Sequence, residues 1–150
     1  MEISNYSRRN FVKTSSVVSA GTLLSVPHIA NAQNSSKTLK VGLVGIGGRG
    51  SGAAAQAMAA DDNVALTAIG DLFEDRIKLR SRILKARGRE KFQVTPETTF
   101  TGFDAYKKVI DSGVDVVILT SPPNFRPQHL EYAVEKGVHC FFEKPVAVDA

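Results

Sequence analysis

The stretch L-K-V-G-L-V-G-I-G-G-R-G, from Leu39 to Gly50, decides how the rest of the chain folds. Leu39–Val44 is a short apolar run that ends at a glycine, which is typical of a buried strand in a parallel sheet. Gly45, Gly47 and Gly50 follow it with the spacing G-x-G-x-x-G, and an alanine-rich segment comes next. A glycine-rich turn between a strand and a helix predicts the start of a β-α-β unit.

Strand and helix patterns alternate through the following residues. Helices are expected over Ser51–Ala60, Phe73–Arg87, Asp104–Ser112 and Pro127–Lys136, and further strands over Val64–Ile69, Val114–Leu119 and Val138–Phe142. Phe92–Phe100 is ambiguous and can hold a short third strand. Because repeated strand–helix units require a parallel sheet with right-handed crossovers, the sequence predicts an α/β fold. We expect a Rossmann-like, doubly wound parallel sheet of about five strands, truncated at its C-terminal end.

The glycine loop has the composition that holds the pyrophosphate of a dinucleotide. Gly45 permits the tight turn, Gly47 leaves room for the phosphates, and Gly50 lets the helix approach the strand. The phosphate charge would be held by exposed backbone amides of the loop, that of Ile46 included, and by the positive end of the helix. Arg49 can reach the phosphates or face solvent. A glycine-rich turn that binds no ligand is the alternative.

The second strand ends in A-I-G-D, which places Asp71 about twenty residues beyond the glycine loop. A carboxylate at this point accepts the hydroxyls of the adenosine ribose and repels a 2′-phosphate. We therefore expect NAD as the cofactor, with NADP less favoured. Asp71 can also cap the next helix through L-F-E, and the two roles are compatible.

Two further segments are expected at the carboxyl edge of the sheet, where ligands bind in open α/β folds. The fourth strand runs into T-S-P-P, which forces a turn and places Thr120, Ser121 and Pro122 near the nicotinamide half of the cofactor. The fifth strand runs into E-K-P, so Glu143 and Lys144 emerge at the same edge. Lys144 can donate to a substrate hydroxyl and share in proton transfer, whereas contact with Glu143 would hold it charged. A surface turn is the alternative.

Other reactive side chains give weaker signals. His129 lies early in a helix and faces either the cleft or solvent. Cys140 alternates with apolar neighbours, which favours a buried structural thiol over a nucleophile. A single cysteine excludes an internal disulfide and a cysteine-only zinc site, and no metal site is predicted.

Composition bounds the class of protein. The 150 residues carry a net charge of +4 and 43% apolar residues, enough for about one small domain. Cations crowd residues 76–91 without interleaved aromatics, so we interpret them as a solvated helix face and expect no nucleic-acid partner. No apolar run approaches the ~18 residues of a membrane span, so no stable membrane insertion is expected.

The N-terminal residues have the order of an export signal. S-R-R-N-F-V-K at Ser7–Lys13 precedes a mildly apolar stretch and then A-N-A at Ala30–Ala32. This order predicts a twin-arginine (Tat) signal peptide over residues 1–32, with a disordered basic tail as the alternative. Residues 33–38 are expected to be a flexible linker and residues 39–150 an incomplete NAD-binding Rossmann domain. Localisation would be periplasmic or secreted, with the Tat translocase as partner during export.

Four features together resemble the Gfo/Idh/MocA oxidoreductases over residues 40–150. They are the loop G-I-G-G-R-G, Asp71, the T-S-P-P turn and E-K-P-V-A-V-D, of which E-K-P is the most specific. Secreted members such as glucose–fructose oxidoreductase are similar in pairing a Tat leader with this domain. The resemblance implies an NAD(P)-dependent oxidoreductase with tightly held cofactor that acts on a sugar or related polyol. It also implies that Lys144 contacts the substrate and the nicotinamide region.

Members of that family continue into a second domain that supplies most substrate contacts and usually the catalytic histidine and aspartate. We therefore expect this chain to be part of a longer enzyme, inactive alone and lacking the C-terminal substrate domain. Two alternatives stay open, an NAD-retaining glycoside hydrolase of the same family and a non-catalytic nucleotide-binding fragment. Self-association into a homo-oligomer is left open for the full-length protein.

Overall fold

The computed structural model describes residues 37–148, which form one five-stranded sheet in the order β3-β2-β1-β4-β5. The strands are β1 (Leu39–Val44), β2 (Val64–Asp71), β3 (Thr99–Thr101), β4 (Val116–Leu119) and β5 (His139–Phe142). Every neighbouring pair is parallel. The chain starts at the centre, winds outward to β3 and then returns to wind outward to β5. This is the expected doubly wound, Rossmann-like sheet.

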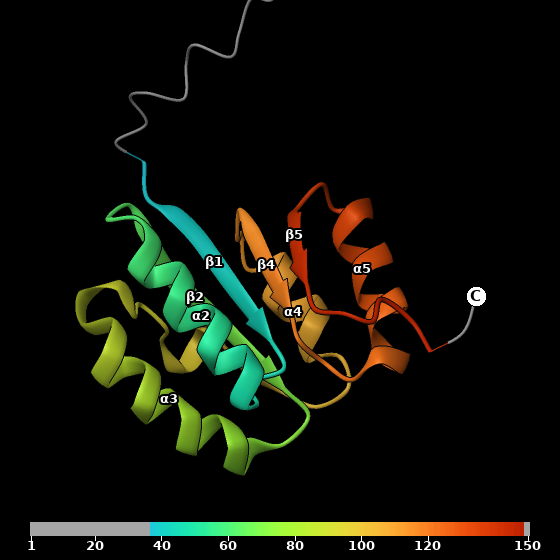
Figure 1. The fold of residues 1–150 in the computed structure, drawn as a ribbon, viewed down its shortest axis with the longest axis horizontal. Coiled ribbons are helices and arrows are strands. Elements are labelled where there is room, and N and C mark those ends of the chain that lie inside the picture. Colours follow the sequence, from blue (N-terminus) through green and yellow to red (C-terminus); the bar gives the residue numbers. More distant parts are fainter. Residues whose placement is uncertain (1–36, 149–150) are drawn as a thin grey trace, which may run out of the picture. The chain divides into compact units, whose positions relative to one another are not determined.

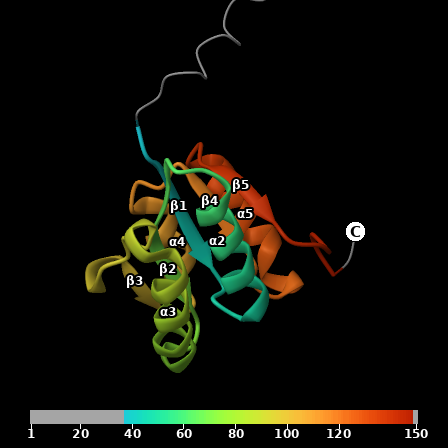
Figure 2. The ribbon, with the colours of Figure 1, turned by 60° about the vertical axis from the view of Figure 1, so that its left-hand side comes forward.

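Helices cover both faces of the sheet. They are α2 (Gly48–Ala60), α3 (Glu74–Gly88), α4 (Ala105–Asp111) and α5 (Arg126–Glu135), with short 3₁₀ turns at Arg89–Lys91, Pro96–Thr98 and Pro123–Phe125. The two ribbon views show α2 and α3 on one side of the sheet and α4 and α5 on the other (Figures 1 and 2). Each crossover therefore returns the chain to the amino edge of the sheet, so that all strands end at the same opposite edge, where their carboxyl ends gather.

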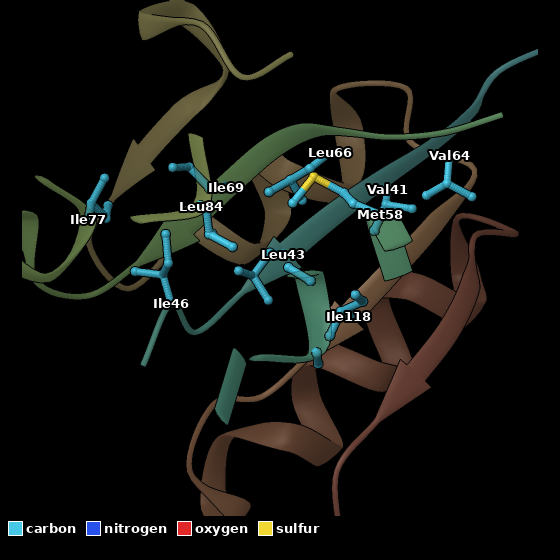
Figure 3. Packing of buried hydrophobic residues seen from close by; sticks show 12 residues of the cluster. Val41, Leu43, Ile46, Met58, Val64, Leu66, Ile69, Ile77, Leu84 and Ile118 are labelled. Carbon is cyan, nitrogen blue, oxygen red and sulfur yellow. The ribbon is translucent and has the colours of Figure 1, made fainter. Parts of the chain in front are cut away.

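An apolar core lies between the sheet and the helices on each of its two faces. Leu43, Leu66 and Ile69 pack with α2 and α3 in the first core (Figure 3), and Val44 and Ala68 lie in the second core against α4 and α5. Leu66 and Ile69 share a face although they are three positions apart, because the register of β2 against β1 shifts between them. An irregularity of this kind moves the following side chains to the opposite face.

The fold class was predicted correctly, while several boundaries differ. Helix α2 begins at Gly48 rather than Ser51, so the second half of the glycine loop is its first turn. The third strand is Thr99–Thr101 at the end of the ambiguous segment, and Phe92 forms only an isolated bridge with Leu66. β4 begins at Val116 rather than Val114, since the turn at Ser112 and Gly113 and a bend at Asp115 come first.

β5 is an outer strand of the sheet. Phe141 and Phe142 are 49% and 39% exposed, and within residues 37–148 no strand pairs with the far edge of β5. In the same part of the chain, no helix has both the length and the apolar character needed to span a bilayer.

Candidate functional site: a cleft beside the glycine loop

Two glycines let the β1–α2 loop fold against the end of β4. Gly45 has φ +89°, and a Cβ there would lie 2.7 Å from the backbone nitrogen of Ser121. A Cβ on Gly50 would lie 2.0 Å from the carbonyl oxygen of Gly45 and 2.4 Å from Oγ1 of Thr120. Only glycine satisfies both positions, because any side chain would push the helix away from the strand.

Gly47 differs from its two neighbours in the motif. A Cβ placed on Gly47 would meet no atom within 4 Å, so the loop is open at this point. Gly47 is also the N-cap of α2, where no side chain caps the helix and no acidic residue stands in the first turn. Amides at an uncapped helix start are free to bind an anion. The loop thus fits a pyrophosphate in both space and charge.

Asp71 ends β2 beside this loop and is 8% exposed. Its Oδ2 accepts a hydrogen bond from the Ile46 amide at 2.8 Å, and its Oδ1 accepts one from the Phe73 amide at 3.0 Å. The second bond starts α3, so Asp71 joins the loop to the next helix. Each oxygen retains a lone pair that can accept a ribose hydroxyl. The side chain of Ile46 is fully buried in the core, and its amide is already bound to Asp71.

A cleft of about 290 Å³ lies at the carboxyl edge of the sheet, beside β1, β2 and β4 and the turn after β3. Six of the residues predicted for the cofactor site line it together: Gly45, Gly47, Asp71, Thr120, Ser121 and Pro122. Much of its remaining wall is aromatic, from Phe73, Phe103, Tyr106 and Phe125. A largely apolar cleft with a carboxylate among its lining residues suits a nucleoside.

A cation and an aromatic ring that the sequence analysis did not assign to the site also line the cleft. The guanidinium of Arg76 lies 4.9 Å from the centroid of the Phe73 ring, and both residues line the cleft. Phe73 is 48% exposed at the start of α3. Its position two residues after Asp71 was the available signal, because an exposed aromatic beside a ribose-binding acid can stack on a base.

Several polar side chains that line the cleft come from the turn after β4 and from α5. Oγ1 of Thr120 donates to the Gly45 carbonyl at 2.6 Å, which ties the turn to the glycine loop. Oγ of Ser121 lies 3.0 Å from Nδ1 of His129, and the imidazole stacks on Tyr106 with ring centroids 4.1 Å apart. His129 thus faces the cleft rather than solvent. Burial lowers its pKa to about 4, so the ring is neutral at pH 7.

Arg126 is a structural member of the site that the sequence analysis missed. It is 6% exposed, and its Nε donates to the carbonyl of Ser121 at 2.9 Å. Its Nη1 donates to the carbonyl of Glu143 at 2.6 Å and to that of Pro145. Arg126 therefore joins the turn after β4 to the turn after β5. A cation in the first turn of a helix opposes the helix dipole, and that unfavourable placement was a readable signal.

The remaining predicted residues lie outside the cleft. Nε of Arg49 donates to Oε1 of Glu143 at 2.7 Å, and Nη2 of Arg49 contacts the same oxygen as an ion pair. This hydrogen bond raises the pKa of Arg49 and lowers the pKa of Glu143. Lys144 is exposed, and its peptide bond to Pro145 is cis. The structure thus brings Arg49 to Glu143 and leaves Lys144 apart from the cleft.

Cys140 has the features of a structural thiol. It is half-buried in β5, its Sγ donates to the Val138 carbonyl at 3.3 Å, and burial raises its pKa. A thiol held in its protonated form is a poor nucleophile. Between residues 37 and 148, no cluster of His, Cys, Asp and Glu has the geometry to hold a metal ion.

Comparison with known proteins finds the same fold in solved structures and identifies the family of this chain. The family model GFO_IDH_MocA, described as an oxidoreductase family with an NAD-binding Rossmann fold, matches residues 39–150. The structure of scyllo-inositol dehydrogenase from Lactobacillus casei with NAD(H) and scyllo-inositol is 25% identical, with a TM-score of 0.60 over 75% of this chain and 30% of that one. An NAD binding oxidoreductase from Klebsiella pneumoniae is 27% identical, with a TM-score of 0.56 over 75% of this chain and 28% of that one.

Curated relatives carry a different name. A glycosyl hydrolase family 109 protein from Shewanella pealeana is 27% identical over 94% of this chain and 34% of its own length. Another from Streptomyces coelicolor is 26% identical over 85% of this chain and 25% of its own length. The chain therefore spans about a third or a quarter of the relatives that it matches.

Proposed function

The chain belongs to the Gfo/Idh/MocA oxidoreductase family with its NAD-binding Rossmann fold, and from this premise we propose that it is the cofactor-binding part of an NAD-dependent oxidoreductase acting on a sugar or related polyol. NAD is preferred over NADP, because the carboxylate of Asp71 lies in the cleft wall where it would repel a 2′-phosphate. The names of the solved relatives, an inositol dehydrogenase among them, support a polyol-like substrate.

One observation carries the proposal. Gly47 opens the loop at the uncapped start of α2, while Asp71 lines the same cleft and binds the Ile46 amide of that loop. An anion-binding helix start beside a ribose-binding carboxylate matches the diphosphate and the ribose of an adenosine diphosphate. The aromatic walls from Phe73 and Phe103 then suit the adenine ring.

The chain's own residues have distinct parts in the reaction. Bound nicotinamide would accept or return the hydride. Thr120 and Arg126 hold the turns after β4 and β5 in place through backbone carbonyls. Lys144, in the second of these turns, would donate to a substrate hydroxyl and share in its proton transfer. Its exposed position leaves it accessible to a substrate held by a further domain.

Dinucleotide binding by this chain is the direct test. We expect NADH to bind with a dissociation constant at least ten-fold lower than that of NADPH, measured by the fluorescence of the reduced nicotinamide. Gly47→Val should abolish binding while the folded structure survives, because the side chain would fill the open point of the loop. A folded chain that binds neither dinucleotide would refute the proposal.

A second candidate function is glycoside cleavage with retained NAD. The names of the two curated relatives favour it. In such an enzyme the sugar is oxidised and then reduced again, so NADH does not accumulate. Incubating the full-length protein with glycosides and a matching free sugar separates the two functions. Release of the aglycone without NADH supports the hydrolase, and NADH formed in proportion to oxidised sugar supports the dehydrogenase.

We also propose that the protein is exported by the Tat pathway, because R-R at Arg8 and Arg9 precedes an apolar stretch and A-N-A. These residues lie outside the part of the chain that the structure describes. Since free NAD is scarce outside the cytoplasm, the exported protein would carry its cofactor with it. Replacing both arginines by lysine should keep the protein in the cytoplasm. Unchanged export of that variant would exclude the Tat route.

A further inference from the structure

The ion pair between Arg49 and Glu143 joins two parts of the edge that are 94 residues apart in sequence. Arg49 lies in the first turn of α2, two residues after the open position of Gly47. Glu143 directly follows β5. The pair therefore runs from the proposed phosphate site to the turn that carries Lys144.

Glu143 is the fixed member of this pair. Its side chain is 15% exposed, its amide donates to the Leu119 carbonyl at 3.2 Å, and its own carbonyl accepts from Arg126 at 2.6 Å. The side chain of Arg49 is 58% exposed and reaches Glu143 only through its guanidinium. Glu143 consequently sets where the guanidinium of Arg49 points, and not the reverse.

Arg49 keeps donors for a second anion. Its Nε and Nη2 both contact Oε1 of Glu143, whereas Nη1 has no partner within residues 37–148. A guanidinium has five N–H donors in a planar fork, so one edge can bind a carboxylate while another binds a phosphate. A cation is otherwise unfavourable at a helix start, where the dipole is positive. A bound pyrophosphate next to Gly47 would remove that penalty.

We propose that Arg49 is a ligand of the cofactor's pyrophosphate and that Glu143 is the positioning residue that aims it, so that the two together slow the release of the dinucleotide. This inference rests on the proposed function, since it requires NAD in the glycine loop. The inference gives a physical reason for slow release of the cofactor, which is that Glu143, in the turn after β5, holds Arg49 against the pyrophosphate. Glu143 acts here through Arg49 and not by touching the phosphates.

The dissociation rate of NADH tests the inference. Bound NADH is displaced with excess NAD, and the loss of its fluorescence is followed in time. Arg49→Gln should raise the rate roughly 30-fold and Glu143→Gln roughly 10-fold, as expected for lost charge-assisted hydrogen bonds. The double variant should release NADH no faster than Arg49→Gln alone, because the two residues act as one unit. Arg49→Lys should fall between the original chain and Arg49→Gln.

Two controls separate this role from a structural one. The exchanged pair, Arg49→Glu with Glu143→Arg, should restore the melting temperature but not the slow release, since a carboxylate would then face the phosphates. Lys136→Gln removes another ion pair, with Asp111 at 2.7 Å, and should leave the release rate unchanged. That pair joins the C-cap of α5 to the end of α4, and neither residue lines the cleft.

The outcomes are distinguishable. If Glu143→Gln leaves the release rate unchanged or lowers it while Arg49→Gln raises it, Arg49 acts alone and the positioning role is wrong. If all folded variants release NADH at the original rate, the whole inference is wrong while the proposed function stands. If the original chain binds no NADH, the proposed function fails and the inference fails with it.

Discussion

The carboxyl edge of the sheet has an enclosed half and an open half. Over β1, β2 and β4, the side chains of Asp71 and Thr120 hydrogen-bond to the backbone of the glycine loop, and together these segments line a cleft of about 290 Å³. Beyond β5, Glu143 and Lys144 stand outside this cleft, and Phe141 and Phe142 are exposed beside them. The two halves carry residues predicted for one cofactor, yet they are built in different ways.

The difference lies in what holds each half. The enclosed half depends on close approach of main chains, which the glycines allow and any side chain would prevent. The open half depends on two long side chains, Arg49 and Arg126, that reach Glu143 from α2 and α5. Substitutions should therefore damage stability in the first half and leave it almost intact at the outer residues of the second.

The largest effect is expected from Gly50→Ala in the enclosed half. The new Cβ would lie 2.0 Å from a backbone carbonyl that cannot move alone, so the free energy of unfolding should fall by about 3 kcal/mol. Gly47→Ala is the matched control, because its Cβ meets nothing within 4 Å, and should change stability by less than about 0.5 kcal/mol. Urea denaturation measures both. Equal losses would contradict the view that close approach of main chains at Gly50 stabilises the enclosed half.

The second effect is a loss of stability on acidification, through His129. Its pKa is about 4 in the folded chain against 6.5 ordinarily, because burial disfavours the charged ring. As the pH falls, the unfolded chain binds the proton first, so stability is complete above pH 6.5 and decreases down to about pH 4. Between pH 7 and 5 the loss should be about 2 kcal/mol.

His129→Asn provides the comparison for this prediction. The amide oxygen can replace Nδ1 as partner of Ser121, but the side chain does not titrate. The variant should be less stable at pH 7 and should show a flatter dependence of unfolding free energy on pH between 4 and 6.5. A slope equal to that of the original chain would assign the acid sensitivity to other groups.

These contrasts also explain what the sequence could predict. The glycine spacing, Asp71 and the T-S-P-P turn follow strand ends directly, so topology alone brings them to one edge and their clustering was foreseeable. For Arg126 the sequence offered only its unfavourable place in the first turn of a helix, because its partners are backbone carbonyls, which leave no pattern in the sequence. The pairing of Arg49 with Glu143 depends on the reach of a flexible side chain across the edge, and periodicity carries no information about that.

A smaller effect is expected for Asp71→Asn, measured on ligand binding. The amide oxygen can accept from Phe73 or Ile46 but loses the charge that repels a 2′-phosphate. NADH affinity should fall about ten-fold, or about 1.4 kcal/mol, and the preference over NADPH should narrow by a similar factor. Fluorescence titrations with the two reduced dinucleotides give both values. An unchanged preference for NADH over NADPH would mean that Asp71 does not set it and would turn attention to Arg76 and Phe73.

The smallest effect on this chain should come from Lys144→Gln in the open half. Lys144 is exposed, so unfolding free energy should change by less than about 0.5 kcal/mol. NADH should bind the variant within a few-fold of the original affinity, because the cleft does not include this residue. A clear loss of stability would mean that Lys144 supports the fold and would weaken its proposed part in proton transfer. Intact folding and binding, together with lost turnover in the full-length enzyme, would place its contribution in the chemical step, where an exposed lysine meets its substrate.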